Sequence, residues 1–379
     1  MDPIAHTLVG ASMAETGAKN SSRLATATLM IGANLPDIDA LATALGQEAM
    51  YGLRRGWTHG ALAMVVLPAL LAGAMTLYGR WRPPKDPDDG PPLRPWHLLA
   101  FSYISVWSHP ALDWLNNYGV RLLMPFDDTW FYGDALFIVD PWMWLSMAAA
   151  VVLARSNSKM SLGAWSVLGL ASTGLITAVD TVPLLAKVVW FTAVAAIVFA
   201  RARPDIVKRS ALIARAALVF LTLYIASMLG ATALARQQAH QWFTQQDLNV
   251  THVMAGPLPA NPFVRDIIAV TPTTYHFARL DWLSDPVLTN NRLPMAIGDQ
   301  LPEAKAVLKS PKLAGFNHWT RFPSYTVTPN PDGGHTVHIQ DVRYTRMKGA
   351  RIGKATVTLD NQLQVLEVSF GAKDNHAHH

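Results

Sequence analysis

The stretch Ser108-His109-Pro110-Ala111-Leu112-Asp113 follows a long apolar run, Leu98 to Trp107. It places an imidazole and a carboxylate four residues apart, so both side chains project from one face of a helix. That spacing suits two ligands of a single metal ion. The stretch therefore predicts an apolar helix that carries a metal-binding pair at one end.

The composition of the chain indicates a membrane protein with an additional soluble part. Of the 379 residues, 51% are hydrophobic and 15% are charged, whereas about 25% charged residues are typical of a soluble domain. Residues 1–235 consist mostly of apolar blocks, and residues 236–379 resemble a soluble protein. We expect an α-helical polytopic membrane domain over 1–235 and a small soluble α+β domain over 236–379.

The membrane half divides into eight apolar segments, which we expect to be helical. They cover residues 1–17, 24–35, 60–78, 96–112, 136–154, 162–179, 182–200 and 211–235. The first two segments are marginal as membrane spans, because about 20 residues are needed to cross about 30 Å of hydrocarbon.

The distribution of Lys and Arg predicts the orientation of these segments. One alternate set of loops is rich in both residue types, whereas the other set has only Arg54, Arg55 and Arg121 in its loops. Since positive loops face the cytoplasm, the soluble domain is expected on the extracytoplasmic side.

Candidate metal ligands lie at the ends of the apolar segments. They are His6, Asp37, Asp39, His59, His109 and Asp113. The order of the segments places all six at the outer side of the membrane. The chain has no Cys, so a metal would have to bind His and carboxylate groups. Each residue alone is more often an interfacial cap, and Asp113 could simply pair with a nearby Arg. Their convergence on one side favours a divalent metal site, with Zn²⁺ preferred and Mn²⁺ or Mg²⁺ as alternatives.

The charged residues around these ligands suggest hydrolysis. A metal ion lowers the pKa of bound water toward roughly 7 and polarises a phosphoryl or acyl group. Asp37 or Asp39 could accept the proton as a catalytic base, and Arg54 with Arg55 could hold an anion. A site at the membrane surface favours membrane lipid, or another lipid-like or phosphoester substrate. No basic stripe with interleaved aromatic residues points to nucleic acid, and the sequence identifies no protein partner.

Four motifs in order resemble the membrane-bound, metal-dependent hydrolases known in bacteria as LexA-regulated hydrolases. The motifs are Asp2-Pro3 with His6-Thr7 and Gly10, Leu35-Pro36-Asp37-Ile38-Asp39, Arg55-Gly56-Trp57-Thr58-His59, and His109-Pro110-Ala111-Leu112-Asp113. The resemblance covers roughly residues 1–200 and implies a multi-pass, metal-dependent hydrolase of the bacterial inner (cytoplasmic) membrane. The His-x-x-x-Asp element is also distantly similar to the zinc-dependent phospholipase C and P1 nuclease superfamily. That similarity implies His59, His109, Asp113 and one of Asp37 or Asp39 as ligands, with His6 a weaker fit.

The soluble part contains patterns of both strands and helices. Residues 263–283, 324–328, 335–344 and 354–370 are rich in alternating apolar and polar or β-branched residues, which predicts an antiparallel sheet. Residues 236–246 predict a polar continuation of the last membrane helix, and residues 301–308 a short helix. The proline-rich residues 257–262 suggest a stiff connector.

Two other functions compete with the hydrolase hypothesis. A transporter would use buried Asp and His as an ion path and would distribute them through the depth of the membrane. A scaffold protein would bind its partner through the soluble domain and would survive the loss of every metal ligand.

Overall fold

The computed structural model describes residues 1–86, 90–331, 333–346 and 349–371. They divide into two compact units, each assembled from separate stretches of the chain. The helical unit contains Met1–Ile38, Arg55–Ala233 and Pro257–Val264. The sheet unit contains Asp39–Arg54, Leu234–Gly256 and the described residues from Arg265 onward.

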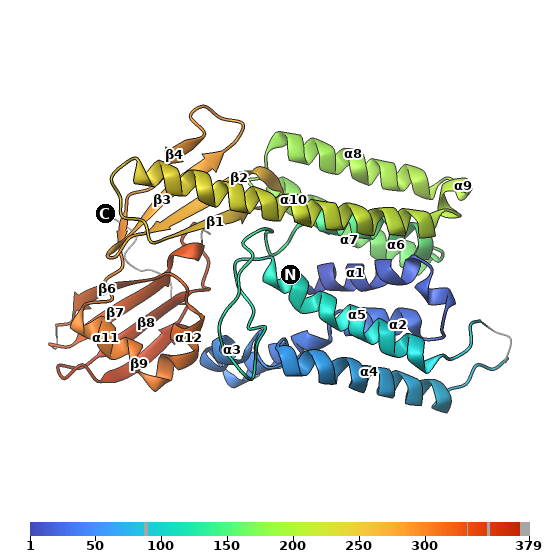
Figure 1. Ribbon diagram of the computed structural model, residues 1–379, viewed down its shortest axis with the longest axis horizontal. Coiled ribbons are helices and arrows are strands. Elements are labelled where there is room, and N and C mark those ends of the chain that lie inside the picture. The colour runs from blue at the N-terminus through green and yellow to red at the C-terminus, as the bar shows by residue number, and fades with distance from the viewer. Residues whose placement is uncertain (87–89, 332, 347–348, 372–379) are drawn as a thin grey trace. The chain divides into compact units, whose positions relative to one another are not determined.

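The helical unit is a bundle of helices that run roughly parallel or antiparallel to one another (Figure 1). Its helices are α1 (Pro3–Glu15), η1 (Ala18–Asn20), α2 (Ala25–Gly32), α4 (Ala61–Trp81), α5 (Pro95–Trp114), α6 (Pro141–Arg155), α7 (Lys159–Ala178), α8 (Leu184–Arg201), α9 (Pro204–Val207) and the larger part of α10 (Ser210–Thr244). The 3-10 helix η2 (Leu35–Leu45) begins in this unit and ends in the sheet unit.

Helix α1 lies inside the helical unit and contacts α2, α5 and α6. Asp2 caps it, because Oδ1 of Asp2 accepts hydrogen bonds from the backbone N–H groups of Ile4 and Ala5, both at 3.0 Å. Gly10 allows α2 to approach closely, since a Cβ atom at this position would lie 2.6 Å from the carbonyl oxygen of Leu29. His6 is consequently held in the interior and is fully buried.

Four helices among the described residues are long and apolar enough to cross a membrane, namely α4, α7, α8 and α10. The expectation of eight such segments is therefore not supported. Helices α1 and α2 have only 13 and 8 residues, fewer than the roughly 20 that a span needs. Helix α6 is apolar but has 15 residues. Helix α5 has 20 residues, but its sequence includes polar side chains such as those of His109 and Asp113.

The sheet unit contains two sheets and several short helices. Its first sheet has the strand order β1-β2-β3-β4, with β5 also paired to β3, and its second has the order β6-β7-β8-β9. The strands are β1 (His252–Leu258), β2 (Asn261–Val270), β3 (Thr274–Asp281), β4 (Leu288–Asn290), β5 (Met295–Ala296), β6 (Pro323–Pro329), β7 (His335–Asp341), β8 (Lys354–Leu359) and β9 (Val365–Phe370). The helices are α3 (Gln47–Leu53), α11 (Pro302–Leu308), η3 (Pro311–Leu313), α12 (Ala314–Trp319) and η4 (Val342–Tyr344).

The expected antiparallel pairing is confirmed, and the strands of the second sheet pair antiparallel throughout. The expected connector over residues 257–262 is wrong. These residues instead end β1, form a tight turn and begin β2, and Ala260 in the turn has φ +56°. Proline is tolerated there because the ends of strands need not donate every hydrogen bond to the sheet. The tip of this hairpin belongs to the helical unit, where Nε1 of Trp142 donates to the carbonyl of Ala260 at 3.3 Å.

A buried ion pair stabilises the end of β7 in the sheet unit. Nη2 of Arg343 donates to Oδ2 of Asp341 at 2.7 Å, and the backbone N–H of Arg321 donates to the same oxygen at 2.8 Å. Burial by itself would raise the pKa of Asp341, but the Arg343 guanidinium and these hydrogen bonds prevail and hold that pKa below its usual value.

The lowered pKa of Asp341 predicts acid sensitivity of the sheet unit. The ionised carboxylate stabilises the fold above its unfolded-state pKa of about 3.9, and this contribution is lost as the pH falls through the lower folded-state pKa. Each unit of lowering contributes about 1.4 kcal/mol. Thermal unfolding followed by circular dichroism should show a steep loss of stability in the wild type below about pH 4 and a flatter dependence in Asp341→Asn. Equal pH dependences in the two proteins would contradict this assignment.

Candidate metal centre

His109 and Asp113 lie one turn apart near the C-terminal end of α5, and both are fully buried. The ring of His109 is oriented by the end of α2, because its Nδ1 lies 2.7 Å from the carbonyl oxygen of Ala33. A carbonyl can only accept, so Nδ1 carries the proton and the lone pair of Nε2 faces the centre.

His59 comes from the loop that precedes α4. Its backbone N–H donates to the carbonyl of Gly56 at 2.9 Å, and its Nδ1 lies 2.9 Å from Oγ1 of Thr58. Gly60 follows directly and packs against the backbone of Met124 so closely that a Cβ atom there would collide with it. This tight loop directs the Nε2 atom of His59 toward the same point as that of His109.

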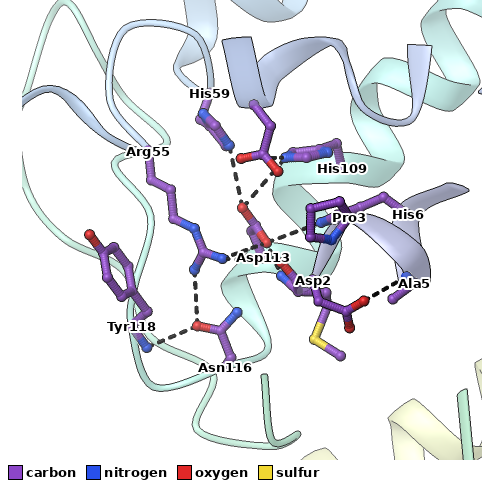
Figure 2. Close-up of polar contacts among 12 residues, drawn as sticks. Asp2, Pro3, Ala5, His6, Arg55, His59, His109, Asp113, Asn116 and Tyr118 are labelled. Carbon is purple, nitrogen blue, oxygen red and sulfur yellow. Dashed lines mark hydrogen bonds and ion pairs between the residues drawn. The ribbon is translucent and has the colours of Figure 1, made fainter. Parts of the chain in front are cut away.

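Asp113 is the common neighbour of the imidazoles, as Figure 2 shows. Its Oδ2 atom lies 3.3 Å from Nε2 of His59 and 3.5 Å from Nε2 of His109. Nε2 of His109 also lies 3.7 Å from Oδ1 of Asp37. One ligand atom from each of these four residues lies within 4.8 Å of the other three. Ligand atoms that share a tetrahedral zinc ion are roughly 3.3 Å apart, since each bond is about 2.0–2.1 Å long.

The donor atoms themselves are consistent with a bound cation. Among the residues that the structure describes, neither Nε2 of His109 nor Oδ2 of Asp113 makes a hydrogen bond, although both atoms are buried. A buried polar atom without a hydrogen bond costs free energy. An ion between these atoms would satisfy both, so the residues present fit a divalent metal.

His6 contacts the centre from a different direction and does not belong to the group of four. Its ring stacks on that of His109, with centroids 3.8 Å apart and planes inclined by 19°. Its Nε2 atom lies 3.3 Å from Oδ1 of Asp113, the oxygen that the amino group of Met1 also contacts. The structure therefore places His6 beside a candidate ligand, where the sequence suggested a ligand.

Arg55 lies on the other side of Asp113 and is also buried. Its Nη2 atom donates to Oδ1 of Asp113 at 2.9 Å, and its Nη1 atom donates to Oδ1 of Asn116 at 3.0 Å. Its guanidinium lies over the ring of Tyr118, 4.8 Å from the centroid. Arg55 is held by these three contacts, so it neutralises and orients Asp113.

The sequence also suggested Asp39 as a ligand or base and Arg54 as an anion-holding residue, and the group of four ligands does not include Asp39. Asp39 and Arg54 belong to the sheet unit, where Nε of Arg54 lies 3.6 Å from Oδ1 of Asp39. In each of the pairs Asp37–Asp39 and Arg54–Arg55, one member is assigned to the helical unit and the other to the sheet unit.

Sequence reasoning missed two contributors to the centre. The sequence Asn116-Asn117-Tyr118-Gly119 is typical of a turn. In the structure, the Oδ1 atom of Asn116 accepts hydrogen bonds from Arg55 and from the backbone N–H of Tyr118. Its position three residues after Asp113 was the available signal. Ala33 contributes only its carbonyl group, for which no side-chain pattern exists.

The model of the YdjM inner membrane protein family matches residues 1–239, which include every residue of the candidate centre. No curated protein and no solved structure matches the chain significantly. Because the family match extends over more than half of the sequence, the chain belongs to the YdjM inner membrane protein family.

Proposed function

We propose that this protein is a membrane-embedded, metal-dependent hydrolase that acts on a phosphoester or lipid-like envelope substrate at the outer face of the inner membrane. The observation that supports it most is the convergence of Asp37, His59, His109 and Asp113 within 4.8 Å. The imidazoles of His59 and His109 with the carboxylate of Asp113 suit Zn²⁺ as three ligands that leave a fourth position for water, with Mn²⁺ or Mg²⁺ as alternatives.

The four residues would have different tasks. His59, His109 and Asp113 are completely buried, whereas the side chain of Asp37 is 15% exposed. Asp37 therefore lies on the accessible side, where it would orient a water molecule and accept its proton. A bound divalent ion would supply the Lewis acid for hydrolysis. Arg55 would keep Asp113 ionised and fixed.

The membrane setting supports a lipid-like substrate. Helices α4, α7, α8 and α10 are suited to a bilayer, and a lipid can reach a membrane-embedded centre by lateral diffusion. The exposed side chains of Ile38 and Trp57, each close in sequence to a residue of the centre, are apolar and suit contact with acyl chains.

The experiment is a hydrolysis assay of the full chain in lipid nanodiscs, with phosphatidylglycerol and bis(p-nitrophenyl) phosphate as substrates and Zn²⁺ or Mn²⁺ added after chelation. We expect metal-dependent phosphate ester cleavage that falls at least about 100-fold in Asp37→Asn, the usual scale for losing a positioned acid–base group. Asp127→Asn is the matched control, because the carboxylate of Asp127 accepts a hydrogen bond from the backbone N–H of Thr129 in an exposed loop.

Wild-type protein that cleaves neither substrate with either metal would argue against the hydrolase. Equal rates in the wild type and Asp37→Asn would remove Asp37 from the mechanism. A chelator without effect on the wild-type rate would exclude the metal from the reaction.

A further inference from the structure

Between residues of the candidate metal centre, the chain leaves the helical unit and contributes a segment to the sheet unit. Residues Asp39–Arg54, called here the inserted segment, belong to the sheet unit, whereas the residues on either side belong to the helical unit. Asp37 lies two residues before the inserted segment, Arg55 follows it directly, and His59 comes four residues later. Both ends of the inserted segment are therefore close in sequence to residues of the centre.

One aromatic residue anchors the inserted segment in the sheet unit. Tyr51 of α3 is 2% exposed, and its ring contacts those of Trp319, Phe316 and Phe370, with centroids 4.7, 5.1 and 6.1 Å away. Its hydroxyl oxygen accepts a hydrogen bond from the backbone N–H of Gly353 at 3.2 Å. A side chain buried among three aromatic rings contributes several kcal/mol to packing.

A carboxylate holds the same segment by a second set of contacts. Glu48 accepts hydrogen bonds from two backbone N–H groups of α12, those of Gly315 and Phe316, the latter at 3.2 Å. Helices α3 and α12 lie side by side (Figure 1). Their backbones approach closely where Gly52 meets Gly315, since a Cβ atom on Gly315 would lie 2.7 Å from the Cα atom of Gly52. The contact leaves little freedom for α3 to shift along α12.

The two ends of the inserted segment are joined to each other. Asp39 is its first residue and Arg54 its last, and their side chains form the ion pair at 3.6 Å described above. The side chain of Asp39 is only 6% exposed. The pair therefore limits how far apart Asp37 and Arg55 can move, because each of them is within two residues of one member.

We propose that the sheet unit is a positioning element for the metal centre: by holding the inserted segment, it fixes the spacing between Asp37 and the Arg55–His59 loop. Asp39, Arg54, Glu48 and Tyr51 are then positioning residues rather than catalytic ones. The proposal rests on metal binding at the centre. Partners that hold ligands in place change metal affinity by about 10- to 100-fold. The coupling is reciprocal, so metal binding must also stabilise the held segment.

The first test measures zinc affinity of the full chain in nanodiscs by competition with a chromogenic chelator. We expect Tyr51→Ala and Glu48→Ala each to weaken zinc binding by at least about tenfold. Phe322→Ala and Glu303→Ala are the matched controls. Phe322 is a buried aromatic residue of the same unit, and Glu303, like Glu48, lies in the first turn of a helix there. Both controls should lower the melting temperature, with zinc affinity within about twofold of wild type.

The second test is hydrogen exchange of peptides from residues 39–54 with and without zinc. Exchange should slow on zinc addition in the wild type and should not respond in His109→Ala, which lacks a ligand. A purely structural role of the inserted segment would give no zinc-dependent change.

The outcomes separate this proposal from the proposed function. Zinc binding by the wild type that is unchanged in Tyr51→Ala and Glu48→Ala would overturn the positioning role alone. Equal weakening in Phe322→Ala would also overturn it, because general destabilisation of the sheet unit would then explain the effect. Absence of zinc binding in the wild type would overturn both.

Discussion

Replacement of His109 by alanine is expected to lower the affinity for zinc by at least about 100-fold, because the loss of a ligand should exceed that of an outer partner. The mutation removes Nε2, which lies near both Asp113 and Asp37, and it also removes the hydrogen bond to Ala33. Metal content after dialysis against a weak chelator, measured by atomic emission, is the readout.

His97→Ala is the control for this experiment. His97 lies in the first turn of the same helix and contacts Phe101 rather than the centre. It should keep a wild-type metal content. If His109→Ala retained zinc as firmly as His97→Ala, the assignment of His109 as a ligand would be wrong.

Replacement of Asp113 by leucine is expected to destabilise the helical unit by about 3–5 kcal/mol, because Arg55 would keep its charge in a buried place without its carboxylate partner. The double variant Arg55→Met/Asp113→Leu should recover most of that stability, since apolar side chains of similar volume often replace a buried ion pair without loss. Thermal unfolding of the wild type, Asp113→Leu, Arg55→Met and the double variant gives a double-mutant cycle for this ion pair.

The same cycle distinguishes a structural ion pair from a metal centre. The double variant should be nearly as stable as metal-free wild type, yet it should bind no zinc and hydrolyse nothing. Additive effects of the two substitutions would show that Arg55 and Asp113 are not coupled, contrary to the 2.9 Å contact between them. Zinc binding by the double variant would exclude Asp113 as a ligand.

The gathering of His59, His109, Asp113 and Asp37 could be anticipated from the sequence. Each lies at an end of an apolar segment, and the alternation of segments predicts on which side those ends meet. The four-residue spacing of His109 and Asp113 survives in the structure because α5 continues through both. The carbonyl of Ala33 that orients His109 could not be anticipated, since every residue has a backbone carbonyl and the sequence does not show which one meets the ring.

The number of membrane helices was overestimated for a physical reason. An apolar segment is equally suited to lipid and to a protein interior, so composition does not separate the two. Helix α1 illustrates this, because Ala5, Leu8 and Val9 are buried against neighbouring helices. Length separates them better, and the 13 residues of α1 are too few for a span.

The inserted segment could not be recognised from the sequence. Glu48 and its partner Gly315 are 267 residues apart along the chain, and no local pattern links them. The sequence therefore suggested Asp39 and Arg54 as site residues together with Asp37 and Arg55. Only the fold shows that each pair is divided between two compact units.

The central claim is that one divalent ion is held jointly by imidazole and carboxylate groups of the helical unit. X-ray absorption spectroscopy of zinc-loaded, full-length protein tests it most directly. The account predicts about one zinc per chain with a first shell of two imidazole nitrogens and carboxylate oxygens at about 2.0–2.2 Å. Protein that retains no zinc, or zinc without imidazole in its first shell, would contradict it.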